Sequence, residues 1–322
     1  MRKKKGSKKG LFVLMCIGVF TLSFIGSAVF KITHKAEWSQ KYEVAWNDQV
    51  GTLHTDISYG EGAANKFDLY TPADTTKENY GLVVYLHAGG FTSGDKADDA
   101  AILQWLCSKG YVAAGINYTL RTDDNEASVY SQSMEIKQAM PIIVEKAKEL
   151  GYNLDEMAIS GGSAGGTLAM LYAYRDANES PIPVKMMFEM VGPSSFYAED
   201  WDNYGLDTNK EAAVGLFGIM LGNDIDKDLI GTAELQEKMK PISSFAWVDE
   251  QTVPSVIAYG KHDKICPFKS ASHLVNALAE KQVDYAYFEA PHSGHGLQND
   301  DKVYGEFMAT VETYLAKYLP VE

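Results

Sequence analysis

Residues 159–166 read ISGGSAGG, and residues 161–165 match the pattern G-x-S-x-G with Ser163 at the centre. The apolar residues 157–159 come directly before this stretch, and the helix-forming residues 167–173 follow it. This order predicts a strand, a tight turn and a helix, with the serine hydroxyl exposed at the turn. The flanking glycines let other backbone approach without meeting a Cβ atom. Ser163 is therefore the candidate nucleophile.

An acid and a histidine follow two further predicted strands. A serine hydroxyl barely ionises at neutral pH, so it needs a histidine to accept its proton and a carboxylate to orient that histidine. Asp263 follows the apolar stretch 255–259, and His295 follows the stretch 283–289. The carboxyl ends of parallel strands meet at one edge of a sheet, which brings such residues together. The chain order Ser163, Asp263, His295 is the one expected when the nucleophile occupies such a turn.

Each of these assignments has a competitor. A five-residue glycine pattern often marks only a turn, and an aspartate in a loop rich in Gly and Pro is usually solvated. The strand before Asp263 and the histidine that follows it favour catalysis. His262 and His292 lie in the same loops and compete with His295, but only His295 stands between two glycines, where the backbone can bend to aim the ring inward. The other histidines fall outside these loops and are interpreted as ordinary surface or linker residues: His34, His54 and His273.

A glycine-rich loop offers donors for the negative charge that builds on an acyl oxygen. Residues 82–86 form an apolar stretch that runs into HAGGF at residues 87–91. Backbone N–H groups in such a loop can bind an oxyanion, and each donor contributes about 3–4 kcal/mol. The candidates are Gly89, Gly90 and Ala164, and His87 is expected to brace the loop. The alternative is a glycine turn that only closes the strand.

The first 30 residues predict a membrane segment. Six positive charges lie within residues 1–10, and the 20 residues 11–30 carry none. As a helix this stretch would span about 30 Å, the thickness of a bilayer core. Its length favours an uncleaved anchor over a signal peptide, although the small residues 26–28 offer a cleavage site. We expect a cytoplasmic N-terminus and an extracytoplasmic domain on a cell membrane, or alternatively a secreted domain.

Composition restricts the partners of that domain. The formal charge of the chain is −14, and without the six positive N-terminal residues the remainder carries −20. No basic patch remains outside the first ten residues, so nucleic acid is not an expected partner. No spacing of His, Cys and Asp suggests a metal site, and no cofactor is expected. Cys107 and Cys266 are expected to be free thiols.

The pattern along the chain predicts an α/β fold in one domain, residues 53–322, preceded by a linker and entry helix at 31–52. Residues 193–252 interrupt the alternation of strands and helices and are interpreted as a helical cap over the active site. The regular pattern predicts a mostly parallel sheet with helices on both faces and an antiparallel N-terminal edge. The predicted strands are 54–59, 66–70, 82–86, 111–118, 157–160, 184–191, 255–259 and 283–289, and the predicted helices are 97–108, 128–150, 164–175, 269–281 and 301–318.

From about residue 55 to 320 the chain resembles an α/β-hydrolase of the hormone-sensitive-lipase-like acetyl esterase group, which is also similar to feruloyl and acetyl-xylan esterases. The resemblance implies an oxyanion hole at Gly89, Gly90 and Ala164. Ala88 replaces the first glycine of the family's loop. In the family an arginine directly follows the tyrosine, whereas here the arginine comes later, as Arg121, which leaves the bracing role of Arg121 open. The motifs that carry the resemblance are HAGG at 87–90, GINY at 115–118, GGSAG at 161–165, GKHD at 260–263 and GHG at 294–296.

The first hypothesis is a serine carboxylesterase that acts on small, uncharged acyl esters such as acetylated or feruloylated sugars. A second is an exopeptidase of the prolyl-oligopeptidase type, which shares the serine turn but usually carries a large preceding propeller. A third is an inactive α/β-hydrolase that binds a ligand or a partner at the cell surface. Such proteins usually lose a catalytic residue, whereas all three have candidates here. The oligomeric state stays open.

Overall fold

The computed structural model describes residues 37–321, without the side chains of Glu37, Trp38 and Asn203. The chain divides into two units, Met1–Glu43 and Val44–Glu322. In the described part of the first unit, helix α2 spans Glu37–Gln40. The second unit holds a sheet with the helices that cover it.

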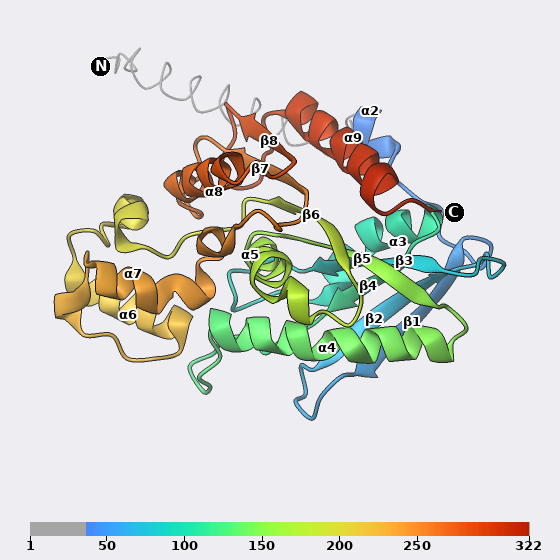
Figure 1. The fold of residues 1–322 in the computed structure, drawn as a ribbon, viewed down its shortest axis with the longest axis horizontal. Helices are drawn as coiled ribbons and strands as arrows, with labels where there is room; N and C mark the ends of the chain where they lie inside the picture. Colours follow the sequence, from blue (N-terminus) through green and yellow to red (C-terminus); the bar gives the residue numbers. More distant parts are fainter. Residues whose placement is uncertain (1–36, 322) are drawn as a thin grey trace, which may run out of the picture. The chain divides into compact units, whose positions relative to one another are not determined.

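Eight strands form one sheet in the order β1-β2-β4-β3-β5-β6-β7-β8 (Figure 1). β1 pairs antiparallel with β2, and β2 with β4, whereas all other neighbours are parallel. The predicted mostly parallel sheet and its antiparallel N-terminal edge are therefore confirmed. The strands are β1 Gly51–Ser58, β2 Lys66–Pro72, β3 Tyr80–Leu86, β4 Val112–Ile116, β5 Leu154–Gly162, β6 Val184–Met190, β7 Ser255–Gly260 and β8 Tyr285–Ala290.

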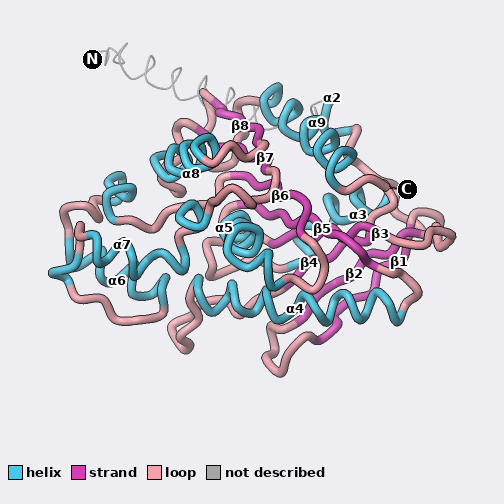
Figure 2. Tube along the Cα trace, viewed as in Figure 1, coloured by secondary structure: helices cyan, strands magenta, loops and turns pink. Residues whose placement is uncertain are grey.

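Helices cover both faces of the sheet (Figure 2). The main core packs α4, α5 and α8 against one face, while α3 and α9 contact the other. Every residue of β4 and of β7 is buried, because strands covered on both faces exclude water on both sides. The predicted helix at 164–175 ends its α-helical part early and continues as one π-helical turn. These helices are α3 Ala100–Ser108, α4 Val129–Glu149, α5 Ala164–Leu171, the π-turn η2 Tyr172–Asp176, α8 Phe268–Glu280 and α9 Asp301–Tyr318.

A helical insertion separates β6 from β7, where the sequence predicts an interruption. Trp201 and Phe217 are buried and pack edge to face at 6.2 Å, so these aromatic residues form a small local core. Tyr204 instead stays 46% exposed. The insertion contains η4 Ala198–Tyr204, α6 Lys210–Leu221, η5 Lys227–Leu229, α7 Ala233–Met239, η6 Lys240–Ile242 and η7 Ser244–Trp247.

Within the described part of the predicted linker and entry helix, residues 37–52, helix α2 ends at Gln40, before Tyr42 and Trp46. β1 begins at Gly51. Asn47 forms a turn between them, because its side chain accepts from the N–H of Gln49 and its carbonyl accepts from the N–H of Val50. Such local bonds compete with a helix.

The predicted cytoplasmic segment 1–10 and membrane segment 11–30 lie outside the described residues. Within residues 37–321, none of the helices combines the length and apolar character needed to cross a bilayer. Cys107 in α3 and Cys266 before α8 are buried free thiols, as expected. Burial raises the pKa of the Cys107 thiol to about 12 and that of Cys266 well above its usual value, so both thiols stay protonated.

Candidate active site

Ser163 occupies a strained turn between β5 and α5. Its φ is 53° and its ψ is −120°, a left-handed conformation that side-chain-bearing residues rarely adopt. Two glycines make the turn possible: a Cβ atom on Gly161 would lie 2.4 Å from the carbonyl carbon of Gly165, and one on Gly165 would lie 2.0 Å from the carbonyl oxygen of Leu86. The chain therefore folds tightly enough to lift the serine hydroxyl above the carboxyl edge of the sheet.

His295 connects the serine to the acid. Its Nε2 lies 2.8 Å from Oγ of Ser163, and its Nδ1 lies 2.7 Å from Oδ2 of Asp263. The carboxylate of Asp263 is 1% exposed, and its other oxygen accepts the N–H groups of Ile265 and Cys266 at 2.8 and 2.9 Å. Because an ionised carboxylate only accepts, Nδ1 of His295 carries the proton and Nε2 can accept from the serine hydroxyl.

The loops that carry the acid and the histidine contact each other through backbone. A Cβ atom on Gly260 would lie 2.2 Å from the carbonyl oxygen of Gly294, so glycine is needed for this approach. Asp300 fixes the histidine loop, since it accepts from the N–H of His292 at 3.0 Å and from the hydroxyl of Ser293 at 2.6 Å.

The two competing histidines do not contact Ser163. The His292 side chain is 76% exposed and its Nδ1 lies 2.9 Å from Asp300. His262 is exposed to solvent. Of the three histidines in these loops, the structure therefore brings only His295 to the serine and the buried acid.

The glycine loop after β3 presents unused backbone donors to the same site. Gly89 has a φ of 127° and Gly90 a φ of 60°, and a Cβ atom on Gly89 would lie 1.9 Å from the carbonyl oxygen of Ser93. Among the hydrogen bonds of residues 37–321, none uses the N–H of Gly89 or Gly90. Ala164 begins α5, where the N–H groups of the first turn have no partner within the helix.

His87 packs behind this loop. Its ring stacks on Tyr118 with centroids 4.3 Å apart, and its Nδ1 lies 2.7 Å from the carbonyl oxygen of Ala88. The hydroxyl of Tyr118 donates to the carbonyl of His87 at 2.9 Å. Burial lowers the pKa of His87, so the ring is neutral near pH 7. These contacts fit a brace and place no ring nitrogen of His87 on Ser163.

Gln132 of α4 is a support that the sequence does not reveal. Its side-chain amide donates to the carbonyls of Phe91 and Thr119 at 2.9 and 2.8 Å, which ties the glycine loop to the loop after β4. The displaced Arg121 directs its guanidinium to the carbonyl of Ala127, while its backbone N–H donates to Phe91. A single glutamine in a long helix carries no motif that would identify this role.

Glu189 is a second buried acid near the serine turn. It lies in β6 and is fully buried, and its Oε2 accepts the N–H of Gly192 at 2.8 Å. A Cβ atom on Gly166 would lie 2.8 Å from that oxygen, which places the carboxyl against the first turn of α5. Burial raises the pKa of Glu189 to about 8. In the sequence, the position of Glu189 inside the largely apolar stretch 184–191 is the signal that could have indicated a buried acid.

An open pocket of about 570 Å³ surrounds the serine. The residues of the helical insertion, 193–252, do not line it; the insertion contacts the acid loop through Tyr204, whose hydroxyl donates to the carbonyl of Ile265 at 2.9 Å. The pocket walls are largely apolar, and the glycine loop and His295 form part of them. The lining residues outside the glycine loop are Tyr85, Gly162, Ser163, Met190, Val191, Ile265, His295, Gly296, Leu297 and Tyr304.

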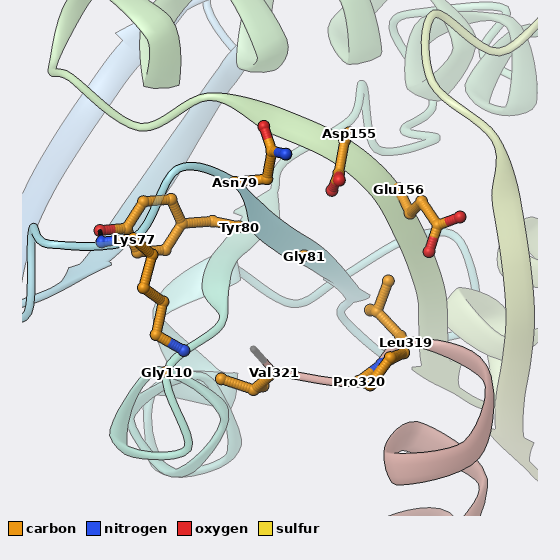
Figure 3. A pocket seen from close by; sticks show the side chains of 10 residues that line it. All are labelled: Lys77, Asn79, Tyr80, Gly81, Gly110, Asp155, Glu156, Leu319, Pro320 and Val321. Carbon is orange, nitrogen blue, oxygen red and sulfur yellow. Dashed lines mark hydrogen bonds between the residues drawn. The ribbon is translucent and has the colours of Figure 1, made fainter.

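A smaller cavity of about 70 Å³ lies at the opposite edge of the sheet (Figure 3). Tyr80 and Asp155, at the amino ends of β3 and β5, line it together with the C-terminal residues Leu319 and Val321. In parallel sheets, catalytic residues gather at the carboxyl edge. Within residues 37–321 there is no group of three or more His, Cys, Asp and Glu side chains that could hold a metal ion.

Three comparisons relate the chain to known proteins. It is 25% identical over 261 residues to the probable carboxylic ester hydrolase LipM of Mycobacterium tuberculosis (strain ATCC 25618 / H37Rv). The aligned region covers 75% of this chain and 56% of LipM. Esterase B from Lactobacillus rhamnosis superposes with a TM-score of 0.64 at 18% identity, over 93% of this chain and 94% of that one. A truncated carbohydrate esterase from gut microbiota gives 0.67 at 18% identity, over 84% and 99%.

The likeness to the solved structures shows the α/β-hydrolase fold. The chain spans about half the length of LipM. The BD-FAE family model matches residues 67–278, a range that runs from β2 through the serine turn and the acid loop into α8. The chain belongs to the BD-FAE family of α/β-hydrolases.

Proposed function

We propose that this protein is a serine carboxylic ester hydrolase in which Ser163, His295 and Asp263 form the catalytic triad. The observation that carries the proposal is the pair of hydrogen bonds at 2.8 and 2.7 Å through the two nitrogens of His295. The family and the names of the relatives support ester hydrolysis as the reaction. No cofactor takes part in this chemistry.

The geometry supports a two-step reaction. Nε2 of His295 takes the proton of Ser163 while Oγ attacks the ester carbonyl, and the buried Asp263 stabilises the imidazolium that forms. The N–H groups of Gly89, Gly90 and Ala164 stabilise the oxyanion. The tetrahedral intermediate then breaks the bond to the alcohol oxygen, which leaves with the proton from His295. A water molecule activated by the same nitrogen hydrolyses the acyl-enzyme and releases the acid.

The pocket supports small, uncharged acyl esters as substrates. Met190, Val191 and Leu297 give it an apolar lining. The formal charge of −20 beyond the first ten residues disfavours the approach of anionic substrates. Acetylated or feruloylated sugars fit the resemblance of the chain to feruloyl and acetyl-xylan esterases. The name of one structural neighbour, a carbohydrate esterase, is consistent with such substrates.

A series of p-nitrophenyl esters from acetyl to long-chain acyl groups tests the proposal with the full chain in mild detergent. The wild type is expected to hydrolyse the short esters, and Ser163→Ala to lose at least about 10⁴-fold in kcat because it lacks the nucleophile. A matched thermal unfolding curve checks that the variant is folded. Hydrolysis of peptide anilides instead of esters would favour the exopeptidase, and full activity of Ser163→Ala would refute the assigned nucleophile.

We further propose that residues 11–30 anchor the protein in a cell membrane with residues 31–322 on the outer side. The support is the uncharged stretch of 20 residues after six positive charges. Protease added to intact cells should degrade the domain, and the protein should remain in the membrane fraction after a carbonate wash. Recovery of the domain in the medium would instead indicate cleavage of the segment.

A further inference from the structure

Tyr85 is a buried residue that lines the pocket around Ser163. The residue lies near the end of β3 and is 6% exposed, and it forms part of the pocket wall. A Cβ atom on Gly162 would lie 3.7 Å from the Tyr85 hydroxyl oxygen, which places this oxygen beside the residue that precedes the nucleophile. No hydrogen bond among residues 37–321 uses this hydroxyl, and its oxygen is not fully buried, so it is open to the pocket. A ligand that displaces water from this part of the pocket must then supply a partner for the hydroxyl.

This hydroxyl is a donor in a largely apolar pocket, whose wall holds one further tyrosine, Tyr304. Burial, with a further contribution from the charge of Asp99, raises the pKa of Tyr85 well above its usual value, so its proton is retained throughout the working range of a histidine base. Met190 and Leu297 in the same pocket carry no hydrogen-bonding side chain. A small number of polar groups in an apolar pocket is the arrangement that fixes the orientation of a small ligand.

The proposed reaction defines which part of the substrate can reach Tyr85. The alcohol oxygen must lie beside Nε2 of His295 to receive its proton, and the carbonyl oxygen must face the N–H groups of Gly89 and Ala164. Tyr85 and Gly162 lie near the carboxyl ends of β3 and β5, and the proposed reaction uses neither of them for these two contacts. The remaining substituent of the carbonyl carbon is the acyl group.

We propose that the hydroxyl of Tyr85 donates a hydrogen bond to an oxygen atom within the acyl group, so that the site selects hydroxyacyl or alkoxyacyl esters over alkanoyl esters of equal length. Tyr85 is then a specificity residue of the ester hydrolase. The inference rests on the proposed function. It adds a class of acyl group that neither the triad nor the oxyanion donors require.

Isosteric pairs of p-nitrophenyl esters test the proposal with the full chain. The pairs are glycolate with propionate, methoxyacetate with butyrate, and 3-methoxypropionate with valerate. The first two place the oxygen on the α-carbon, as a hydroxyl and as an ether, and the third moves it one carbon farther from the carbonyl. The measured quantity is the ratio of kcat/KM within a pair, compared between the wild type and Tyr85→Phe. This comparison cancels the intrinsic reactivity of each ester. Tyr85→Phe is expected to lower the ratio about 3–10-fold for at least one pair, as for the loss of one neutral hydrogen bond.

Tyr118→Phe is the matched control, because it also removes one tyrosine hydroxyl near the site. Tyr118 donates to the carbonyl of His87 in the glycine loop, so its loss should lower both members of a pair by the same factor. A ratio that falls equally in both variants would overturn the role of Tyr85.

Two further results would also overturn the inference, and they can be told apart. Ratios that agree within about twofold between wild type and Tyr85→Phe, with alkanoyl esters still hydrolysed, would refute the role of Tyr85 and leave the proposed function intact. A folded wild type that hydrolyses none of the esters would refute the proposed function, and the assignment to Tyr85 with it.

Discussion

Two buried carboxyl groups lie near the candidate nucleophile, and the protein holds them in different ways. Asp263 accepts two backbone N–H groups on one oxygen and His295 on the other. Glu189 accepts one backbone N–H, from Gly192, and its Oε1 is buried with no hydrogen-bond partner among the described residues. The neighbouring hydroxyl of Tyr259 donates to the carbonyl of Gly192. Burial alone therefore does not identify the catalytic acid, because both are buried and only Asp263 has the donors that an anion needs.

The different surroundings of the Asp263 and Glu189 carboxyl groups match where each of them lies in the site. In the proposed reaction, an anionic Asp263 would stabilise the imidazolium that His295 becomes. Glu189 lies against the first turn of α5, whose N–H of Ala164 is a proposed oxyanion donor. A negative charge there would oppose the charge that develops on the substrate, whereas a protonated carboxyl does not. The raised pKa of Glu189, about 8, keeps this group neutral at pH 7.

The largest effect is expected from Asp263→Asn. The asparagine oxygen can still accept from Ile265 and Cys266, but its amide then faces Nδ1 of His295 and forces the ring proton onto Nε2. The wrong tautomer cannot accept from Ser163, so kcat on a short ester should fall on the order of 10⁴-fold. Steady-state kinetics measure it, with a thermal unfolding curve as the check on folding. A loss below about tenfold would show that the contrast between the two acids is not functional.

The sequence predicts the parts of the site that depend on local chemistry. The turn at Ser163 and the loop at Gly89 are visible because a left-handed backbone or a close approach requires glycine there. Asp263 and His295 could be chosen because each follows a strand, and the carboxyl ends of parallel strands converge. The mostly parallel character of the sheet follows from the same alternation.

Long-range contacts could not be predicted in this way. Gln132 lies 41 residues from Phe91, and only the packing of α4 beside the glycine loop brings the two together. The aromatic spacing up to Trp46 misled for a related reason. That residue lies beyond the end of α2, and its ring packs on Tyr70 with centroids 5.5 Å apart. Helical periodicity and contact with a sheet edge can give the same pattern of apolar residues.

Glu189→Gln tests the comparison between the two acids through a smaller effect, which is on the free energy of unfolding. The glutamine keeps the acceptor for Gly192 and resembles the protonated acid in shape. In the wild type the folded state holds the proton of Glu189 up to about pH 8, whereas the unfolded chain releases it near pH 4.5. Between these values the folded state binds more protons, so its stability falls as pH rises. Each unit of the shift is worth about 1.4 kcal/mol, so the variant should gain a few kcal/mol relative to wild type from pH 5 to pH 8.

The other ionisable groups around Glu189 do not titrate in this window. Burial raises the pKa of Tyr174, Tyr259 and Cys266 above their usual values, so all three are neutral up to pH 8. Urea unfolding of both proteins at pH 5, 6.5 and 8 measures the difference, and the exposed Glu280→Gln serves as the control for loss of one acid. If the difference between Glu189→Gln and wild type were the same at all three pH values, the carboxyl of Glu189 would be as well solvated or as well paired in the folded state as in the unfolded chain. The two acids would then differ in location and not in charge, and the donors around Asp263 would no longer explain why it faces the histidine.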